Sequence, residues 1–269
     1  MIHPFPVMMV VALATILVIA TVRDALDLSR LVRAIAAIFS SQVVVGISND
    51  YHDRWLDAQG QPWKPLASGV VKPNEARGLI AIAFISMLIF GISLGLIVFL
   101  LVLLGTFAGL LYNFWLRDTP FSWFPYVLGF VTLPIAIWVA MEHFDVRQLG
   151  LIPIGLPLLF SVHLAQTLPD NETDIALGVR GFAVTIGRAR GVIVVWVALV
   201  SAQIVALASA AWIQLNLEIL VAAISISFAF VVASIWLYHR QPTSTTLRIV
   251  FRLIAPSAVI LIAGWLIAL

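Results

Sequence analysis

Acidic side chains gather at two places in this chain. The first, in the stretch NDYHDRWLD, contains Asn49, Asp50, Asp53 and Asp57. Their spacing places them along one face of a helix if the helix continues through them. Like charges arranged in this way repel, raise each other's pKa and destabilise the helix end unless cations neutralise them. The stretch is therefore a candidate cation site.

The second cluster, in LPDNETDIALGVRG, contains Asp170 and Asp174, four residues apart. One such cluster is often only a solvated helix end, but two, each followed by cations and glycines, favour a shared function. Carboxylate and amide oxygens are ligands that suit Mg²⁺, together with waters and substrate phosphate oxygens. We therefore expect Mg²⁺ as the cofactor, with candidate ligands Asn49, Asp50, Asp53, Asp57, Asp170 and Asp174.

Membrane-spanning helices must position these clusters. The chain of 269 residues is 62% hydrophobic and only 10% charged, which is more apolar surface than one soluble core can hide. The absence of cysteine excludes disulfides, thiolate nucleophiles and cysteine-ligated metals. A net charge of +2 is too small to indicate nucleic acid. We predict an all-α, polytopic membrane helical bundle with a single domain over residues 1–269.

Apolar runs long enough to cross a bilayer number nine. They cover residues 5–22, 31–49, 75–95, 96–115, 122–142, 149–168, 191–212, 216–238 and 248–268. The third and fourth runs are continuous, and we expect the turn between them near Gly91 or Gly95. The first run lacks a cationic leading segment and a convincing cleavage site, so we interpret it as a helix rather than a signal peptide.

The distribution of cations predicts the orientation. With the N-terminus in the cytoplasm, eleven of the fifteen cations lie on the cytoplasmic side, and only Arg23, Arg30, Arg33 and Arg147 lie on the other. Both acidic clusters follow even-numbered helices and so emerge on the cytoplasmic face. We expect a multi-pass protein of the cell membrane whose site opens to the cytoplasm.

A Mg²⁺ and diphosphate site above an apolar cavity fits a substrate with a charged head and a long apolar tail, and polyprenyl diphosphates have this form. Lys64, Lys72, Arg117 and Arg180 are candidates for contact with the diphosphate oxygens. Aromatic faces stabilise an allylic cation. Most aromatic residues near these loops are better explained as interfacial residues, and Tyr112 is the strongest exception.

The two clusters carry a resemblance to a known family. N-D-x-x-D-x-x-x-D at 49–57, followed by KPLASG at 64–69, resembles the first signature of the UbiA superfamily of intramembrane prenyltransferases. Asp170, Asp174, Gly178 and Arg180 resemble its second signature. The resemblance includes both motifs, their separation and the nine-helix plan, so it covers essentially the whole chain.

The resemblance implies a helical bundle around a cavity open to lipid, with Mg²⁺ and an isoprenyl diphosphate at its cytoplasmic mouth. Asn49, Asp53 and Asp57 would then face one Mg²⁺ and Asp170 and Asp174 a second, while Asp50 fits the motif but can instead serve the loop. Tyr112 would lie near the breaking allylic bond. The catalytic residues implied are Asp53, Asp57, Asp174 and Tyr112, and the diphosphate would be bound by Asn49, Lys64, Arg117 and Arg180.

The function implied is Mg²⁺-dependent transfer of a prenyl group to a small hydrophobic acceptor, which we expect to be aromatic or a quinone precursor. Two departures limit this reading. Gly181 stands where the family has Thr or Ser, and IHPFP at 2–6 replaces the quinone-branch RP, which leaves the acceptor open.

Other functions were weighed on the same residues. A prenyltransferase acting on a non-aromatic acceptor, such as a lipid or sugar phosphate, is an alternative that the diphosphate motifs do not separate from the expected one. A cation-coupled transporter would need acids or broken helices near the membrane midpoint, whereas these acids gather at helix ends. A CDP-alcohol phosphotransferase would need a D-G-x-x-A-R opening, which is missing. We expect His52 and His163 to be hydrogen-bonded bundle or interface residues rather than ligands.

Overall fold

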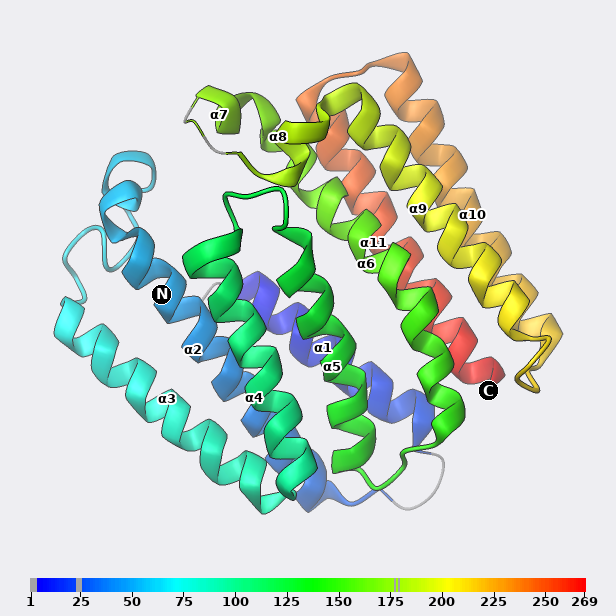
Figure 1. Ribbon diagram of the computed structural model, residues 1–269, viewed down its shortest axis with the longest axis horizontal. Coiled ribbons are helices and arrows are strands. Elements are labelled where there is room, and N and C mark those ends of the chain that lie inside the picture. The colour runs from blue at the N-terminus through cyan, green and yellow to red at the C-terminus, as the bar shows by residue number, and fades with distance from the viewer. Residues whose placement is uncertain (1–3, 23–25, 177, 179) are drawn as a thin grey trace. The chain divides into compact units, whose positions relative to one another are not determined.

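The computed structural model describes residues 4–22, 26–176, 178 and 180–269, and every regular element in these ranges is a helix. The longer helices are α1 (Pro4–Thr21), α2 (Leu28–Gly60), α3 (Pro73–Ser93), α4 (Leu96–Leu111), α5 (Trp123–Ala140), α6 (Leu151–Thr167), α9 (Arg188–Ser209), α10 (Leu217–Arg240) and α11 (Ser244–Ala268) (Figure 1). The shorter ones are η1 (Tyr112–Leu116), η2 (Val146–Gly150), η3 (Leu168–Asp170), α7 (Asn171–Ala176) and α8 (Phe182–Ile186).

Eight helices in the described part of the chain are long and apolar enough to cross a membrane, and they include every long helix from α2 onward. This confirms the predicted all-α, multi-pass membrane architecture. The first predicted run is also helical, as α1, but it is not among the eight. The count of nine spans and the cytoplasmic N-terminus therefore stay predictions.

One predicted boundary differs from the structure. The second run was expected to end at residue 49, but α2 continues to Gly60 and contains 33 residues, so it is about 50 Å long at 1.5 Å per residue. Its last turns are polar, so a hydropathy criterion ends too early although the backbone stays helical. The predicted turn between α3 and α4 is confirmed at Gly95, whose φ of 112° favours glycine, whereas Gly91 lies inside α3 against Phe99.

The chain divides into two compact units. The first consists of Met1–Trp115 and Leu128–Phe144, and the second of Leu116–Val127 and Asp145–Leu269. Helix α5 begins in the second unit and continues into the first. Each acidic cluster belongs to its own unit, the first to α2 and the second to the segment after α6. The prediction of a single functional domain concerns both units together and stays a prediction.

Within the first unit, α2 packs against α3 and α4 (Figure 1). A Cβ at Gly109 of α4 would lie only 2.7 Å from Val45 of α2, so glycine permits this close approach. The hydroxyls of Ser41 and Thr106 are 2.7 Å apart and also join the two helices. These contacts place the end of α4 beside the half of α2 that carries the first acidic cluster.

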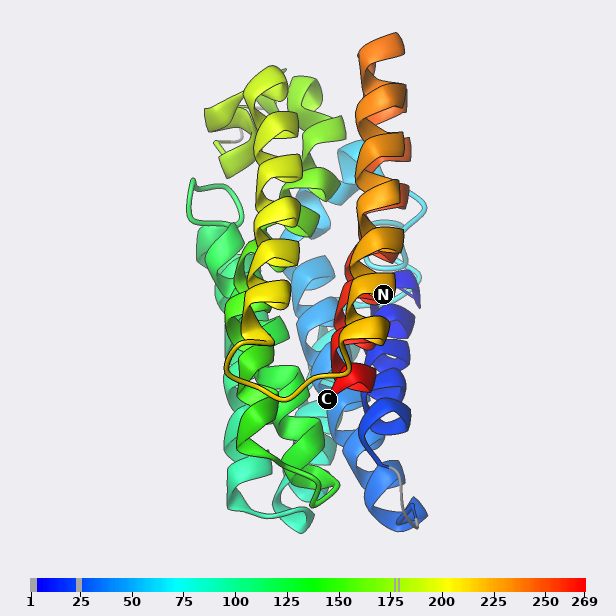
Figure 2. The same cartoon turned by 90° about the vertical axis from the view of Figure 1, so that its right-hand side faces the viewer.

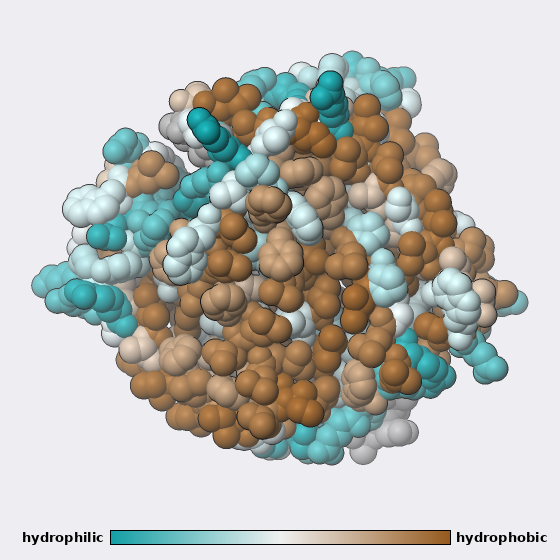
Figure 3. All heavy atoms as spheres, in the orientation of Figure 1, coloured by the Kyte–Doolittle hydropathy of each residue, from teal (hydrophilic) through white to brown (hydrophobic). Residues whose placement is uncertain are grey.

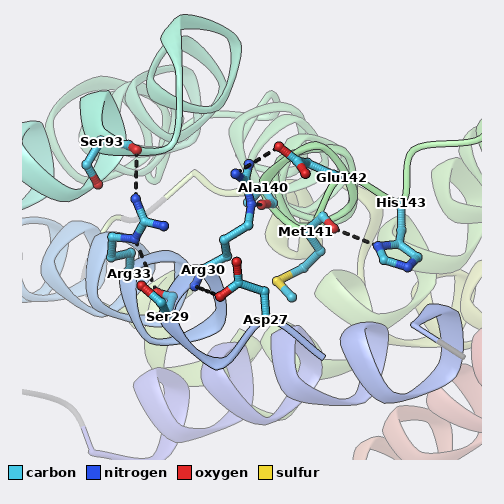
Figure 4. A network of polar contacts seen from close by, with 9 residues as sticks. All are labelled: Asp27, Ser29, Arg30, Arg33, Ser93, Ala140, Met141, Glu142 and His143. Carbon is cyan, nitrogen blue, oxygen red and sulfur yellow. Dashed lines mark hydrogen bonds and ion pairs between the residues drawn. The ribbon is translucent and has the colours of Figure 1, made fainter. Parts of the chain in front are cut away.

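Two arginines near the start of α2 bind the carboxyl ends of other helices (Figure 4). The guanidinium of Arg30 donates to the carbonyl of Ala140, at the end of α5, over 2.6 Å and pairs with Glu142 at 2.8 Å. Arg33 donates to the carbonyl of Ser93, at the end of α3, over 2.9 Å. Cations stabilise the negative ends of helices, so these arginines fix the end of the unit opposite the acidic cluster.

In the second unit, α6 packs against α9 and α10 packs against α11 (Figures 1 and 2). Buried polar side chains connect them: Gln203 of α9 donates to the hydroxyl of Ser227 of α10 over 2.8 Å. The same hydroxyl lies 2.8 Å from that of Ser257 of α11. In a helix bundle surrounded by lipid, such interhelical hydrogen bonds and small residues supply much of the association.

Apolar side chains also cover the outside of the helices, where Figure 3 shows them in brown. Exposed residues of this kind on α3, α4 and α10 include Ile82, Ile85, Ile97, Leu100, Val221 and Phe228. A soluble protein of this size rarely exposes so many large apolar side chains together. The exposed surface is therefore suited to contact with lipid.

Candidate active site

The first acidic cluster lies on the last turns of α2 and divides by burial. Asp50 and Asp57 are buried, with 2% and 7% of their surface exposed, whereas Asn49 and Asp53 are half-buried. Side chains seven residues apart on a helix differ in direction by only about 20° around the helix axis. Asp50 and Asp57 therefore lie on one line along the surface of α2. Asn49 and Asp53 are one turn apart on a neighbouring line. Since α2 continues through the cluster, the condition for a shared helix face is met, and burial separates the cluster into two pairs.

Lys64 lies between the buried pair. Its Nζ is 2.9 and 3.0 Å from the two carboxylate oxygens of Asp57 and 3.2 Å from Oδ1 of Asp50. Burial is the largest single influence on its pKa and lowers it. The hydrogen bonds to Asp57 and Asp50 and the negative charges of both carboxylates together outweigh burial, so the pKa of Lys64 lies above its usual value. The ammonium therefore stays charged at neutral pH.

The loop after α2 folds back and holds Lys64 in place. Leu66 of this loop is buried and packs with Ile47 of α2 and Ala76 of α3. The backbone N–H of Lys64 donates to the carbonyl of Gln61 over 3.0 Å, and the backbone carbonyl of Lys64 accepts from the N–H of Ser68 over 2.8 Å. The lysine is consequently placed by a compact turn rather than by an extended loop.

Tyr112 begins η1, a single π-helical turn at the end of α4, and is half-buried. Such turns are rare and occur frequently at functional sites. Two contacts fix η1 against α2: the amide of Asn113 donates to the carbonyl of Val45 over 2.9 Å, and the rings of Phe114 and His52 meet edge to face with centroids 5.1 Å apart. The sequence analysis did not identify Asn113, since a buried asparagine carries no distinctive spacing.

The second acidic cluster follows α6 without an extended loop. Asp170 ends the 3₁₀ turn η3, and Asp174 lies in the short helix α7, which the search for apolar runs did not detect. Asn171 is buried, and its amide donates to the carbonyl of Ala183 in α8 over 2.7 Å. This bond ties α7 to α8 and places the segment that carries Asp174.

The carboxyl group of Asp174 lies in an acidic environment. Burial raises its pKa most, and the negative charges of Asp170 and Asp118 raise it further, while Arg117 opposes them. Arg117 also donates to Asp118 over 3.2 Å. The second unit therefore brings Asp170, Asp174 and Arg117 into one region. It adds Asp118, a residue with no signature spacing.

Other charged residues around the second cluster are more exposed. Arg180 is exposed and follows Gly178, whose φ of 73° lies in the left-handed region. Asp170 is 3.7 Å from Arg248 of α11, and both side chains are mostly exposed, so this pair adds little stability. Arg188 of α9 is 3.0 Å from Glu172. Arg180 is thus accessible for a ligand oxygen.

His163 is a bundle residue, as expected. It is buried in α6, its Nε2 lies 3.4 Å from the hydroxyl of Ser122, and its ring is 4.9 Å from that of Tyr126. These contacts explain a histidine in an apolar helix without a metal. His52 likewise forms the ring contact with Phe114.

The chemistry of the two clusters fits Mg²⁺. The ligand atoms are carboxylate and amide oxygens, and the crowded carboxylates around Asp174 favour a cation. Within the described residues, no group of three or more histidine or acidic side chains is arranged to hold a metal by itself. Mg²⁺ commonly uses only one or two carboxylates and completes its shell with waters and substrate phosphates. The residues therefore suit an ion that is shared with a phosphorylated ligand.

Fold and motifs together define a class: a polytopic, all-helical membrane protein with acidic motifs at the ends of two helices. The model of the UbiA prenyltransferase family matches residues 7–266, nearly the whole chain. This protein therefore belongs to the UbiA prenyltransferase family, and the resemblance found in the motifs is confirmed.

Relatives of known name cover part of the chain. The 4-hydroxybenzoate octaprenyltransferase of Shewanella pealeana is 29% identical over 177 residues, which are 60% of this chain and 57% of that protein. The digeranylgeranylglyceryl phosphate synthase of Korarchaeum cryptofilum is 30% identical over 159 residues, or 55% of this chain and 53% of its own. The chain thus spans about half the length of the curated relatives it matches.

Solved structures share the fold over almost the whole chain. A structure from work on digeranylgeranylglyceryl phosphate synthase in membranes has a TM-score of 0.79 at 17% identity and covers 97% of this chain and 92% of its own. A UbiA homologue from Archaeoglobus fulgidus, bound to GPP and Mg²⁺, has a TM-score of 0.71 at 16% identity and covers 98% of this chain and 97% of its own. At these identities the likeness establishes the fold.

Proposed function

We propose that this protein transfers an isoprenyl group from an isoprenyl diphosphate to an acceptor within the membrane, in a reaction that depends on Mg²⁺. The observation that carries the proposal is the occurrence of both acidic motifs, on α2 and after α6, in a chain matched from residue 7 to 266 by one prenyltransferase family. The homologue from Archaeoglobus fulgidus with bound GPP and Mg²⁺ supports the donor and the metal.

In this proposal Asn49 and Asp53 hold one Mg²⁺ and Asp170 and Asp174 hold a second. Their oxygen atoms, the partial burial of Asn49, Asp53 and Asp174, and the incomplete ligand sets suit ions shared with a diphosphate. When bound, Mg²⁺ neutralises the charge that develops on the departing diphosphate.

Basic and aromatic residues complete the site. Arg117 and Arg180 bind diphosphate oxygens, since a guanidinium provides paired donors that match phosphate geometry. Tyr112 presents its ring to the allylic carbon from which the diphosphate departs, because an aromatic face stabilises a nearby cation. The π-turn and the Asn113 bond to α2 hold this tyrosine in place.

The acceptor is proposed to be an electron-rich aromatic ring, as in the relatives named for 4-hydroxybenzoate. The relative named for digeranylgeranylglyceryl phosphate supports a glycerol phosphate lipid as the second candidate. A new bond forms between the allylic carbon and the acceptor, the bond to the diphosphate oxygen breaks, and the acceptor loses one proton. The site is proposed to open to the cytoplasm in the cell membrane.

The first test is binding of geranyl and geranylgeranyl diphosphate to the purified protein in detergent, with Mg²⁺, with EDTA and in the Asp53→Asn variant. Binding that requires both Mg²⁺ and Asp53 supports the donor assignment. Turnover with 4-hydroxybenzoate and with geranylgeranylglyceryl phosphate then separates the two acceptors by the product formed. Failure to bind any isoprenyl diphosphate would overturn the proposal.

Transport is a weaker alternative on this structure. All acidic residues that the structure describes lie in the end turns of long helices or in the segments between them, and none lies near the middle of a membrane-spanning helix. Coupled transporters place ionisable groups or broken helices near the midplane. Ion flux in liposomes provides the direct measurement if diphosphate binding fails.

A further inference from the structure

We propose that Lys64 is a positioning residue, the permanent counter-charge of Asp50 and Asp57, and that it does not bind the diphosphate. The inference rests on the proposed function for the identity of the site, but its first test uses the protein without metal or substrate. It gives Lys64 a role different from the diphosphate contact that the sequence predicts.

The carboxylates around the ammonium support this role. A lysine ammonium has three N–H donors and no acceptor. Three carboxylate oxygens lie within reach of Nζ, two from Asp57 at 2.9 and 3.0 Å and one from Asp50 at 3.2 Å. The two oxygens of Asp57 lie close together, so one N–H serves both and a second serves Asp50. The ammonium is thus paired with two carboxylates, whose negative charges also repel an approaching phosphate oxygen.

Burial makes the contacts costly to break. The side chains of Lys64 and Asp57 are 13% and 9% exposed, and that of Asp50 is 2% exposed. Removal of one partner from a buried ion pair leaves an uncompensated charge, and this is strongly destabilising. Movement of Lys64 toward a ligand would leave two buried carboxylates one above the other on α2.

The surrounding loop opposes such a movement as well. Lys64 is enclosed by the turn that begins at Gln61, and two residues later Leu66 is anchored in the apolar cluster with Ile47 and Ala76. With Lys64 in this place, Asp50 and Asp57 serve the lysine. Asn49 and Asp53, on the neighbouring line of α2, are then the pair from this motif that faces the metal.

The test is a mutant cycle of thermal unfolding in detergent with EDTA and without diphosphate. Lys64→Met, which keeps the length of the side chain but removes its charge, is combined with Asp50→Asn and with Asp57→Asn. Lys64→Met alone is expected to lower Tm by roughly 5 °C or more, and each double variant is expected to unfold at a higher temperature than this single variant. The control is Lys72→Met, the same change at an exposed lysine of the same loop.

A binding measurement separates positioning from direct contact. At saturating Mg²⁺, Lys64→Met is expected to lose about 10-fold or more in affinity for geranyl diphosphate, the loss usual for residues that position metal ligands. Asp50→Asn with Lys64→Met is expected to recover most of it, since the charge imbalance is reduced. If Lys64 contacted the diphosphate directly, the double variant would still lack that contact and its affinity would stay well below that of Asp50→Asn alone.

The outcomes are distinct. The counter-charge role would be overturned if the effects of Lys64→Met and of the aspartate substitutions on Tm were additive. It would also be overturned if Lys64→Met alone left Tm unchanged. Loss of diphosphate affinity without rescue would assign Lys64 to the ligand. Wild-type protein that binds no isoprenyl diphosphate would refute the proposed function, while the unfolding cycle would still report on the ion pair.

Discussion

The side-chain amide of Asn113 donates a hydrogen bond to the carbonyl of Val45, one helical turn before Asn49. It links the residue after Tyr112 to the helix that carries the first acidic cluster. Because Gly109 contacts the same valine, the end of α4 is fixed against α2 at two neighbouring points. The position of Tyr112 is therefore coupled to that of Asn49 and Asp53 within the first unit.

Substitution of Asn113 tests this coupling. Asn113→Leu is expected to lower kcat by about 10-fold or more with little change in KM for the isoprenyl diphosphate, since small displacements of a catalytic group are costly. The measurement is steady-state turnover at varied donor concentration. The control is Asn216→Ala, which removes the N-cap of α10 and lowers stability by a similar amount to Asn113→Leu, about 1 kcal/mol. This control is expected to leave kcat unchanged. Unchanged turnover in Asn113→Leu would refute the coupling.

The acidic residues proposed to hold Mg²⁺ are tested by neutral substitutions of nearly equal size. Asp53→Asn and Asp174→Asn are each expected to lower turnover by at least about 100-fold, because each removes a charged ligand while the fold is kept. Turnover, and thermal unfolding as a check on folding, are the measurements. Asp145→Asn, at the start of η2 and outside both clusters, should retain activity. Near-normal turnover in both site variants would refute the two-metal assignment.

The pKa of Asp174 makes metal binding depend on pH. Mg²⁺ and Mn²⁺ bind the ionised carboxylate, and the pKa of Asp174 is raised by burial and by Asp170 and Asp118. Without metal, this raised pKa means that Asp174 favours folding most at low pH, and its contribution falls as pH rises through the interval from the ordinary to the raised pKa. Mn²⁺ affinity should therefore fall on acidification at a pH above the usual aspartate range.

Neighbouring substitutions should move this midpoint in opposite directions. Asp118→Asn removes a negative charge, lowers the pKa of Asp174 and extends Mn²⁺ binding to lower pH. Arg117→Gln removes a positive charge and shifts the midpoint upward. Mn²⁺ binding followed by electron paramagnetic resonance in the Asp53→Asn background isolates the second cluster. Shifts of the same sign in both variants would contradict the assigned causes.

Single cysteines test the orientation, since the natural chain contains none. Gly60→Cys and Gly181→Cys are expected to react with a membrane-impermeant maleimide only from the cytoplasmic side. A side chain at residue 60 meets open space, and one at 181 makes an ordinary contact with the carbonyl of Arg117. Trp212→Cys, at an exposed residue just beyond the end of α9, should react only from the outside. The reverse pattern would overturn the predicted topology.

Much of this protein is determined by local sequence. Apolar runs predict the membrane helices because a backbone in lipid must satisfy its own hydrogen bonds. The acid spacing on α2 predicts a shared helix face because helical periodicity does not depend on distant contacts. The motif pattern also identifies the family, which the match to residues 7–266 confirms.

The tertiary structure decides which of these residues meet. The spacing of Asn49, Asp50, Asp53 and Asp57 does not say which pair is buried, and the answer comes from a loop that folds Leu66 into the apolar cluster and so brings Lys64 onto Asp50 and Asp57. Asp118 and Asn113 carry no motif and gain their roles only from contacts in space. The physical reason is that charge pairing and burial depend on distances between residues far apart in sequence or on separate elements, which local periodicity does not encode.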